Sequence, residues 1–552
     1  MKIAKYIDIT YLLTLLITAL IVFIFGLTID FNAIVKPTYY VRCIMDGSII
    51  ALPVLLAWAS LKKPLAIAIN VALVPFLLVN YSYATFFGNF VPLSSYLMVE
   101  NVNSLLFDNF IYSVKYCWLI VLPLPLLFFV KKGKACRIWP ILLVAVVALN
   151  AAFIALEIYI ANRALKSKGL PTYNRYTDPE AYDFDIGIIV ANGLVPYMWS
   201  YYNLQQTFVE RNIVLYDHKS IDTSLLPNGH DDNNYAFAKG KNLIIIFVES
   251  LNSTLIDYKI GGNEVCPNLN QMFNDTASIS AIVKPQVKFG SSSDAHFIVN
   301  TGLLPLHNKI TVQVIGSVPS IAKALNNYSS FISTTDVKYY WNQYATSSFY
   351  GYQENYYAER LNDEYGITHL LDKEILKFTA NKAISQPKPF VAQVVTIAMH
   401  FPFNRVKEKQ EWIMAADSLD NDTKRYLNSA HYFDNSLGEF IGNLKKNNLY
   451  DNCVIAIMGD HITNKVGTTV ASSNTAMVIL NSQCPAGTLP HPVFMRQVDI
   501  YPTLLDLMGA NHYQWKGLGH SIFRPTTPND ERVLDNLSEQ LILSEYFQHH
   551  TF

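Results

Sequence analysis

The stretch Asn242-Leu-Ile-Ile-Ile-Phe-Val-Glu249-Ser250 decides the fold class of the C-terminal half of the chain. Its six central residues are all apolar, and a carboxylate and a hydroxyl follow them directly. An unbroken apolar run of this length is typical of a strand that is buried on both faces of a parallel sheet. Similar runs lie at 390–398 and 454–458, and residues 430–446 have a helical apolar pattern. This alternation predicts an α/β domain with a central, mostly parallel sheet.

The N-terminal part has a different composition, in which apolar runs are separated by short polar or basic breaks. Five runs are each long enough to cross a bilayer as a helix: 9–29, 43–61, 65–87, 111–130 and 138–160. We therefore predict an N-terminal domain of five transmembrane helices. A cleaved signal peptide is the alternative for the first run, but that run is long and no small-residue cleavage site follows it.

The basic residues that flank the five runs predict their orientation, because Lys and Arg stay on the cytoplasmic side of a membrane. They cluster before the first run, between the second and third, and between the fourth and fifth: Lys2, Lys5, Lys62, Lys63, Lys131, Lys132, Lys134 and Arg137. The loop 88–110 contains neither Lys nor Arg. An odd number of helices then places the C-terminal domain on the extracytoplasmic, periplasmic side of the cytoplasmic membrane.

These features divide the chain into a transmembrane anchor at 1–162, a juxtamembrane connector at 163–240 and an extracytoplasmic globular domain at 241–552. The net charge of -1 and the lack of a basic stripe argue against a nucleic-acid partner. Six cysteines are too few and too scattered for a disulfide scaffold. A bridge between Cys453 and Cys484 is left open, and the sequence does not indicate the oligomeric state.

Polar residues follow three of the predicted strands at the point where each strand ends. They are Glu249-Ser250, His400 and Asp460-His461. Ligands of open α/β sheets bind outside the carboxyl ends of the strands, so we expect these side chains to meet in one crevice. Glu249, Asp460 and His461 offer two hard oxygen ligands and one imidazole, which suit a divalent cation such as manganese, zinc or magnesium.

The segment Phe289-Gly290-Ser291-Ser292-Ser293-Asp294 offers hydroxyl groups directly after a glycine, where the backbone can approach a ligand closely. A hydroxyl beside a bound cation loses its proton more readily and becomes a strong nucleophile. By itself the segment is better explained as a serine-rich flexible loop.

Taken in order, these motifs resemble the lipoteichoic-acid synthases and related phosphoglycerol and phosphoethanolamine transferases of the alkaline-phosphatase and sulfatase superfamily. The resemblance covers most of the chain, including the predicted anchor. The motifs are Asn242 to Ser250, Gly290-Ser-Ser-Ser-Asp294, Tyr340-Trp341-Asn342, His400-Phe-Pro-Phe403, Gly459-Asp460-His461 and Asp499-Ile-Tyr-Pro-Thr-Leu-Leu-Asp506. The resemblance implies that the C-terminal domain is a sulfatase-like catalytic domain.

Carried over residue by residue, the resemblance implies a metal site made of Glu249, Asp460, His461 and the nucleophile, with manganese as the expected ion. The nucleophile is usually Thr in these synthases, and the matching residue here is Ser292. Ser291 and Ser293 remain alternatives, because a shift of one residue in the match would select either of them.

The resemblance also implies that Asp336, Trp341 and His400 line the pocket for the headgroup. Two positions depart from the synthases: Gln343 stands where they have an Arg that binds phosphate, and Thr334 stands where they have a His. The chain lacks the Cys-x-Pro-x-Arg signature of sulfatases, which disfavours hydrolysis of sulfate esters.

We therefore expect a metal-dependent transferase that moves a phosphoglycerol headgroup from phosphatidylglycerol to a hydroxyl of an envelope polymer, glycan or lipid. Ser292 would carry the headgroup covalently, and His400 would protonate or orient the leaving oxygen. An anchored site has its lipid donor at high effective concentration. Phosphoethanolamine transfer is the alternative reaction, and a non-catalytic lipid sensor or regulator is the alternative from another class of protein.

Overall fold

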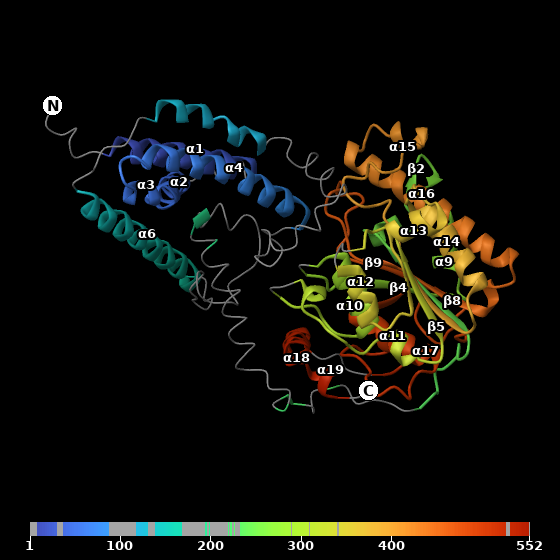
Figure 1. Cartoon of the computed structure of the whole chain (residues 1–552). Helices are drawn as coiled ribbons and strands as arrows, with labels where there is room; N and C mark the ends of the chain where they lie inside the picture. The colour runs from blue at the N-terminus through green and yellow to red at the C-terminus, as the bar shows by residue number, and fades with distance from the viewer. Residues whose placement is uncertain are drawn as a thin grey trace. The chain divides into compact units, whose positions relative to one another are not determined.

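The computed structural model of the chain describes residues 8–29, 37–87, 117–130, 138–167, 194–195, 198, 219, 221–222, 226, 232–288, 290–307, 310–338, 342–525 and 530–550. The chain divides into two compact units, Met1–Arg211 and Asn212–Phe552, coloured from blue to red along the sequence in Figure 1. The finer division at residues 162 and 240 stays a prediction.

The N-terminal unit is helical. In the residues that the structure describes, its elements are α1 (Ile9–Ile29), α2 (Pro37–Ile50), α3 (Leu52–Leu56), α4 (Lys62–Phe87), the 3-10 helices η5 (Cys117–Val121) and η6 (Leu124–Phe129), and α6 (Trp139–Ser167). Among the described residues, three helical stretches are long and apolar enough to cross a membrane: Ile9–Thr28, Lys62–Tyr81 and Trp139–Leu156.

The prediction of five transmembrane helices is therefore wrong for two of the apolar runs, as far as the structure describes them. The run 43–61 is broken between α2 and α3, where Pro53 lies in the first turn of α3. In the run 111–130, the described residues form η5 and η6, with Pro123 and Pro125 at the start of η6. Proline lacks the backbone N–H and its ring clashes with the preceding turn, which disfavours a continuous α-helix at these positions, although α4 keeps Pro75 inside one helix.

Several polar side chains inside the N-terminal unit are paired with one another. Lys62 forms an ion pair with Asp8, and both side chains are buried. Thr18 donates a hydrogen bond to Asn70 over 3.0 Å, and Asn150 donates one to Ser48 over 3.1 Å. Pairing of this kind removes most of the cost of placing polar groups in an apolar helix bundle.

The C-terminal unit contains an eight-stranded sheet in the order β10-β4-β9-β8-β1-β7-β5-β6. Its strands are β1 (Asn242–Val248), β4 (Ile279–Lys284), β5 (Ser329–Thr334), β6 (Glu354–Tyr356), β7 (Phe390–Val395), β8 (Cys453–Gly459), β9 (Thr475–Leu480) and β10 (Val493–Arg496). Every neighbouring pair is parallel except the two pairs that include β9. The predicted α/β fold with a mostly parallel sheet is confirmed. A separate hairpin joins β2 (Lys259–Ile260) to β3 (Asn263–Glu264).

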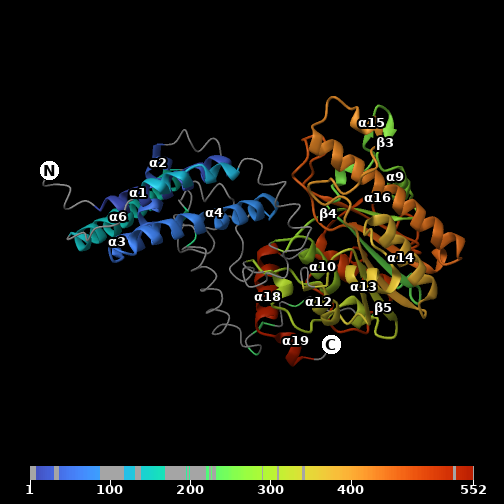
Figure 2. The ribbon, with the colours of Figure 1, turned by 45° about the horizontal axis from the view of Figure 1, so that its top comes forward.

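Helices cover both faces of the sheet, as Figures 1 and 2 show. One face packs against α9 (Pro267–Asn274), α13 (Ala358–Tyr365), α14 (Asp372–Ser385) and α16 (Asn421–Lys446). The other carries α10 (Ser292–Thr301), α11 (Ile321–Ala324), α12 (Gln343–Phe349) and α17 (Ile500–Met508). The remaining α-helices among the described residues of this unit are α15 (Glu411–Met414), α18 (Glu531–Leu543) and α19 (Tyr546–His549). Because helices cover both faces, all seven residues of β1 are buried.

The strand register brings the ends of three strands to one edge of the sheet. Val248 of β1 pairs with Gly459 of β8, and Phe247 pairs with Val395 of β7. The residues that follow these strands therefore emerge at the same level. Cys453 and Cys484, whose pairing the sequence left open, have free thiols in this structure.

Candidate functional site

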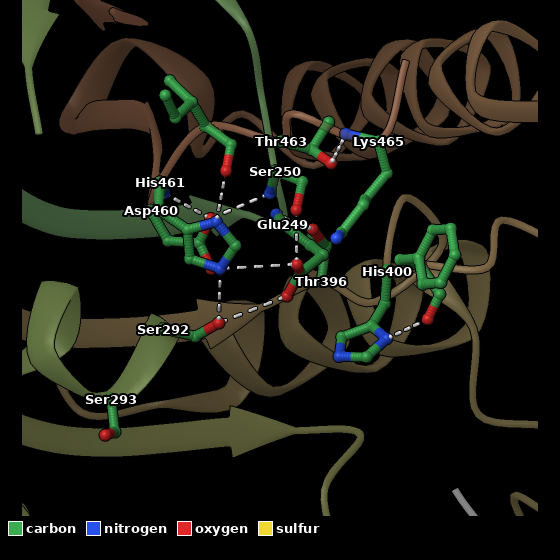
Figure 3. A network of polar contacts seen from close by, with 12 residues as sticks. Glu249, Ser250, Ser292, Ser293, Thr396, His400, Asp460, His461, Thr463 and Lys465 are labelled. Atoms are coloured by element: carbon green, nitrogen blue, oxygen red, sulfur yellow. Dashed lines mark hydrogen bonds and ion pairs between the residues drawn. The ribbon is translucent and has the colours of Figure 1, made fainter. Parts of the chain in front are cut away.

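Glu249, Asp460 and His461 meet at this edge, where β1 and β8 end (Figure 3). His461 Nε2 lies 3.6 Å from Glu249 Oε1 and 3.6 Å from Asp460 Oδ2. The side chains of Glu249, Asp460 and His461 are 5%, 1% and 17% exposed, respectively. One ligand atom from each residue lies within 4.8 Å of the other two, which is close enough for a single metal ion to bridge all three.

Backbone and side-chain hydrogen bonds hold these three residues in place. Asp460 Oδ1 accepts hydrogen bonds from the backbone N–H groups of Ser250, over 2.8 Å, and His461, over 2.6 Å. The Ser250 hydroxyl donates to Glu249 Oε1 over 2.6 Å. His461 Nδ1 lies 3.0 Å from the carbonyl oxygen of Ile462, which fixes the proton on Nδ1 and leaves Nε2 as a lone-pair donor toward the cluster.

The cluster has the chemistry of a cation site. Asp460 Oδ2 is buried and has no hydrogen-bond partner, an arrangement that costs free energy unless another group satisfies it. Burial raises the pKa of Asp460, and nearby His461 only partly offsets the effect. Burial lowers the pKa of His461, but Asp460 and Glu249 outweigh it and the net shift is upward. Two carboxylates and an imidazole that converge in this way fit a divalent cation, which would supply the missing positive charge.

Ser292 begins α10 and points its hydroxyl into the same cluster (Figure 3). Its Oγ donates a hydrogen bond to Glu249 Oε2 over 3.3 Å and lies 3.1 Å from His461 Nε2. The first turn of a helix carries a partial positive charge from its free N–H groups, which favours an anion at this position.

The segment before Ser292 is tightly constrained. Ser291 has a φ of 44°, a left-handed conformation that is rare for a residue other than glycine. At Gly290 an added Cβ would lie 2.3 Å from Asp294 Oδ1, so no larger residue fits without a shift. Asp294 Oδ2 accepts hydrogen bonds from the backbone N–H of Gly290, over 2.9 Å, and of Lys288, over 2.8 Å. Burial raises the pKa of Asp294 to about 6.

The Ser293 hydroxyl is turned away from the cluster (Figure 3). It donates to the carbonyl oxygen of Gly290 over 2.8 Å and is buried. The geometry therefore favours Ser292 over Ser293 as the nucleophile, and the role itself stays a proposal.

His400 follows β7, five residues after the strand ends. Its Nδ1 lies 2.7 Å from the carbonyl oxygen of Phe401, so Nδ1 carries the proton and Nε2 does not. Burial lowers the pKa of His400 to about 4, and the positive charge of Arg405 adds to the effect. His400 is therefore neutral near pH 7, which suits it to accept a hydrogen bond rather than to act as a cationic acid.

The structure describes the other predicted pocket residues only in part. Asp336 follows β5 at the same edge of the sheet, and its Oδ2 accepts a hydrogen bond from Thr334 over 3.2 Å. Gln343 begins α12, but its side chain lies outside the described residues, as does Trp341 altogether. Their role in binding a headgroup stays a prediction.

Two buried residues near the cluster were missed by the sequence analysis. His296 lies one helical turn after Ser292, and its ring packs against Phe247 with 4.4 Å between centroids. Burial lowers the pKa of His296 to about 4. The spacing of four residues from Ser292 was the signal, since it places both on one helix face. Asp372 accepts hydrogen bonds from the backbone N–H of Ile397 and Ala398. Nothing in the sequence around Asp372 indicated that contact.

The last of the sequence motifs, 499–506, is structural. Asp499 forms an ion pair with Arg496 over 2.9 Å, and Asp506 forms one with Arg524 over 2.6 Å. Arg524 also pairs with Asp232 over 2.9 Å. These pairs connect α17 to the segments on either side of it and do not contribute ligand atoms to the cluster.

A comparison with models of protein families finds a match for this part of the chain. Residues 241–510 match the model of the family described as Sulfatase. This part of the chain is a sulfatase-family domain. Lipoteichoic acid synthase 1 of Bacillus subtilis (strain 168) is 31% identical over 314 residues, which are 52% of this chain and 49% of the synthase. The chain thus aligns with about half the length of the curated relatives it matches.

Solved structures similar to part of this chain include the lipoteichoic acid synthase LtaP from Listeria monocytogenes, with 19% identity and a TM-score of 0.46. That match covers 60% of this chain and 96% of LtaP. The phosphoglycerol transferase GacH of Streptococcus pyogenes, in complex with sn-glycerol-1-phosphate, matches with 15% identity and a TM-score of 0.43. It covers 63% of this chain and 96% of GacH.

Proposed function

We propose that the sulfatase-family domain transfers a phosphoglycerol headgroup from phosphatidylglycerol to a hydroxyl group of an envelope polymer, glycan or lipid. The observation that carries the proposal is the placement of the Ser292 hydroxyl, at a helix N-terminus, against Glu249 and His461. A hydroxyl beside two carboxylates and an imidazole is the arrangement of a metal-assisted nucleophile. The sequence similarity to lipoteichoic acid synthases supports the choice of a phospholipid donor.

The proposed reaction has two steps with Ser292 as the carrier. Ser292 Oγ forms a bond to the headgroup phosphorus, the bond from phosphorus to the diacylglycerol oxygen breaks, and that oxygen gains the proton that Ser292 loses. The acceptor hydroxyl then attacks the same phosphorus, and its proton returns to Ser292 as the Ser292 ester breaks. Each step exchanges one phosphate ester for another, so no oxidant or hydrolytic water is consumed.

Glu249, Asp460 and His461 would hold the cation, manganese in the first instance and zinc or magnesium as alternatives. When bound, such a cation supplies Lewis-acid charge that lowers the pKa of a neighbouring hydroxyl. His400 would orient the oxygens that exchange: its unprotonated Nε2 can accept a hydrogen bond from the acceptor hydroxyl.

The N-terminal helices support a membrane location for this reaction. Three of the described helices could cross a bilayer, and a membrane anchor would keep lipid donor near the site at high effective concentration. We propose that the catalytic domain works on the extracytoplasmic side of the cytoplasmic membrane, as the distribution of Lys and Arg in the sequence indicates.

The proposal is tested with the full chain in lipid nanodiscs that contain labelled phosphatidylglycerol and manganese. We expect release of diacylglycerol and a phosphoglycerol adduct on the peptide that contains Ser292. Ser292→Ala should abolish both, whereas Ser293→Ala should keep the adduct because that hydroxyl faces Gly290. An adduct that persists in Ser292→Ala would contradict the assigned nucleophile.

Phosphoethanolamine transfer is a second candidate, favoured by the uncharged Gln343 at the position of the phosphate-binding Arg in the synthases that the sequence resembles. The same assay with labelled phosphatidylethanolamine separates the two reactions, because the adduct mass identifies the headgroup. A Ser292→Ala chain that still performs its role in cells would instead support a non-catalytic sensor.

A further inference from the structure

Lys465 lies in the loop between β8 and β9, four residues after His461. Figure 3 shows its side chain extending from the loop toward Glu249 and Ser250. The ammonium group is thus directed to the side of the cluster where the carboxylate of Glu249 lies. This residue belongs to none of the motifs that the sequence analysis singled out.

The loop is held firmly on the sheet near Lys465. Asn252 is fully buried, and its Oδ1 accepts a hydrogen bond from the backbone N–H of Thr463 over 2.9 Å. Its Nδ2 donates to the carbonyl oxygens of Thr463, over 3.1 Å, and Val470, over 3.0 Å. Since Asn252 follows Glu249 by three residues, the backbone on both sides of Lys465 is tied to the segment that carries Glu249.

Lys465 carries an unpaired charge. With the residues that the structure describes, it forms no ion pair, and its only hydrogen bond is that of its backbone N–H to Thr463. Its side chain is exposed and so can be reached by a ligand. Nevertheless, neighbouring protein atoms displace part of the water around the ammonium and lower the pKa of Lys465. A partly desolvated cation without a partner gains free energy when an anion binds to it.

The ammonium group of Lys288, which lies near the serine segment, already has hydrogen-bond partners. Lys288 donates hydrogen bonds to Asp535 over 2.8 Å and to the carbonyl oxygen of Pro305 over 2.7 Å. A phosphate ester that approaches Ser292 brings its own negative charge next to Glu249 and Asp460. It therefore needs positive charge beyond that of a single divalent cation.

We propose that the Lys465 ammonium binds a non-bridging oxygen of the phosphate ester that reacts with Ser292. Lys suits this role because it is a compact point charge with three N–H donors that can follow a phosphate as it moves between esters. For the identity of the donor the inference rests on the proposed phosphoglycerol transfer. The chemistry recognised is a phosphate ester, which a lipid headgroup and a free glycerol phosphate both supply.

The test compares Lys465→Met and Lys465→Arg with Lys377→Met, which removes an exposed lysine of α14 that has no ion pair among the described residues. In the manganese-loaded full chain, one arm measures the Kd for sn-glycerol 1-phosphate by calorimetry. A second arm measures kcat and KM for diacylglycerol release from phosphatidylglycerol, and a third measures manganese affinity.

We expect Lys465→Met to weaken glycerol phosphate binding and to lower kcat/KM about ten- to hundredfold, the loss typical of one charge-assisted hydrogen bond. Lys465→Arg should recover most of the loss, Lys377→Met should match the unmodified chain, and manganese affinity should stay the same in all variants. Unchanged glycerol phosphate binding in Lys465→Met would overturn the proposal. So would a parallel loss of manganese affinity, or an Arg variant no better than the Met variant.

The binding arm and the kinetic arm together separate this inference from the proposed function. Binding of glycerol phosphate that depends on Lys465, without diacylglycerol release by the unmodified chain, would refute phosphatidylglycerol as donor and support the phosphate contact. Equal diacylglycerol release by the unmodified chain and Lys465→Met would refute the contact and support the transfer reaction.

Discussion

Replacement of Asp460 by Asn should change two quantities in opposite directions: the stability of the cation-free protein and its further stabilisation by a bound cation. Asp460 Oδ1 accepts two backbone hydrogen bonds, whereas Oδ2 is buried without a hydrogen-bond partner. The carbonyl oxygen of Asn can keep both backbone contacts, and the substitution removes a negative charge that burial disfavours. We therefore expect Asp460→Asn to stabilise the cation-free protein and to remove its response to manganese.

The stabilisation of the cation-free protein and the loss of stabilisation by manganese have opposite signs and comparable size. A buried unsatisfied polar atom costs about 1–3 kcal/mol. The amide N–H group of Asn would take the place of Oδ2, 3.6 Å from the unprotonated Nε2 of His461 that can accept from it, so the exchange is worth about 1 kcal/mol at the lower end of that range. With about 2 °C of Tm for each kcal/mol in a domain of this size, the cation-free variant should melt about 2 °C higher. Manganese at 100 times its Kd stabilises a one-site protein by about 2.7 kcal/mol, which is about 5 °C for the unmodified chain.

The assay is thermal unfolding of the full chain followed by tryptophan fluorescence, after chelation and then with added manganese. Asp434→Asn is a matched control, because both oxygens of Asp434 accept hydrogen bonds, from the backbone N–H of Leu269 over 2.7 Å and of Asn268 over 3.1 Å. That variant should lose about 1–3 kcal/mol with and without the cation and keep the full manganese shift.

Equal manganese shifts in the unmodified chain and in Asp460→Asn would place the cation elsewhere. A clear loss of stability in the cation-free variant would refute the reasoning from the unpaired oxygen, because it would mean that Oδ2 makes a stabilising contact.

Three further substitutions test other parts of the domain. Gly290→Ala puts a Cβ 2.3 Å from Asp294 Oδ1, so it should cost about 1–3 kcal/mol and displace the start of α10. Diacylglycerol release should fall at least about tenfold, and unchanged release would argue against the tight fit of this segment. Arg524→Met leaves the carboxylate of Asp506, which is only 4% exposed, without its ion-pair partner. The free energy of unfolding, measured in urea, should fall by about 3 kcal/mol. A loss below about 1 kcal/mol would show that water replaces the Arg524 side chain as the partner of Asp506. Burial raises the pKa of Asp372 to about 6, so the folded state keeps a proton that the unfolded chain releases near pH 4. The stabilisation of the folded state by this proton is fully present below pH 4 and is lost as the pH rises through 6. The stability of the unmodified chain relative to Asp372→Asn should thus fall by about 2–3 kcal/mol between pH 4 and 7, and a flat difference across a pH series of urea titrations would contradict the assigned shift.

The sheet and the cluster were predictable because both depend on local patterns. The strands β1 and β8 are nearly continuous apolar runs and β7 is interrupted only by Gln393, so all three can be recognised without knowledge of their neighbours. Parallel strands end at one edge, so Glu249 and Asp460 could be expected to meet although 210 residues separate them in the chain.

Other features depend on tertiary contacts that leave no local pattern. Asp372 reaches the cluster region through backbone groups of a distant turn, and Lys465 lies in an irregular loop. In the membrane part, the mean hydropathy of the runs suggested continuous helices. The breaks fall at Pro53, Pro123 and Pro125, and composition alone does not predict them, because α4 keeps Pro75 inside one continuous apolar helix.

The pairing of Val248 with Gly459 has a consequence for how the domain tolerates change. The spacing between the two carboxylates is set by main-chain hydrogen bonds of adjacent strands and hardly at all by the side chains beneath them. Conservative substitutions within the two strands should therefore lower the melting temperature long before they disturb the ligand geometry. A single inserted residue in either strand would disturb the ligand geometry directly, since it turns the side chain that follows to the opposite face of the sheet.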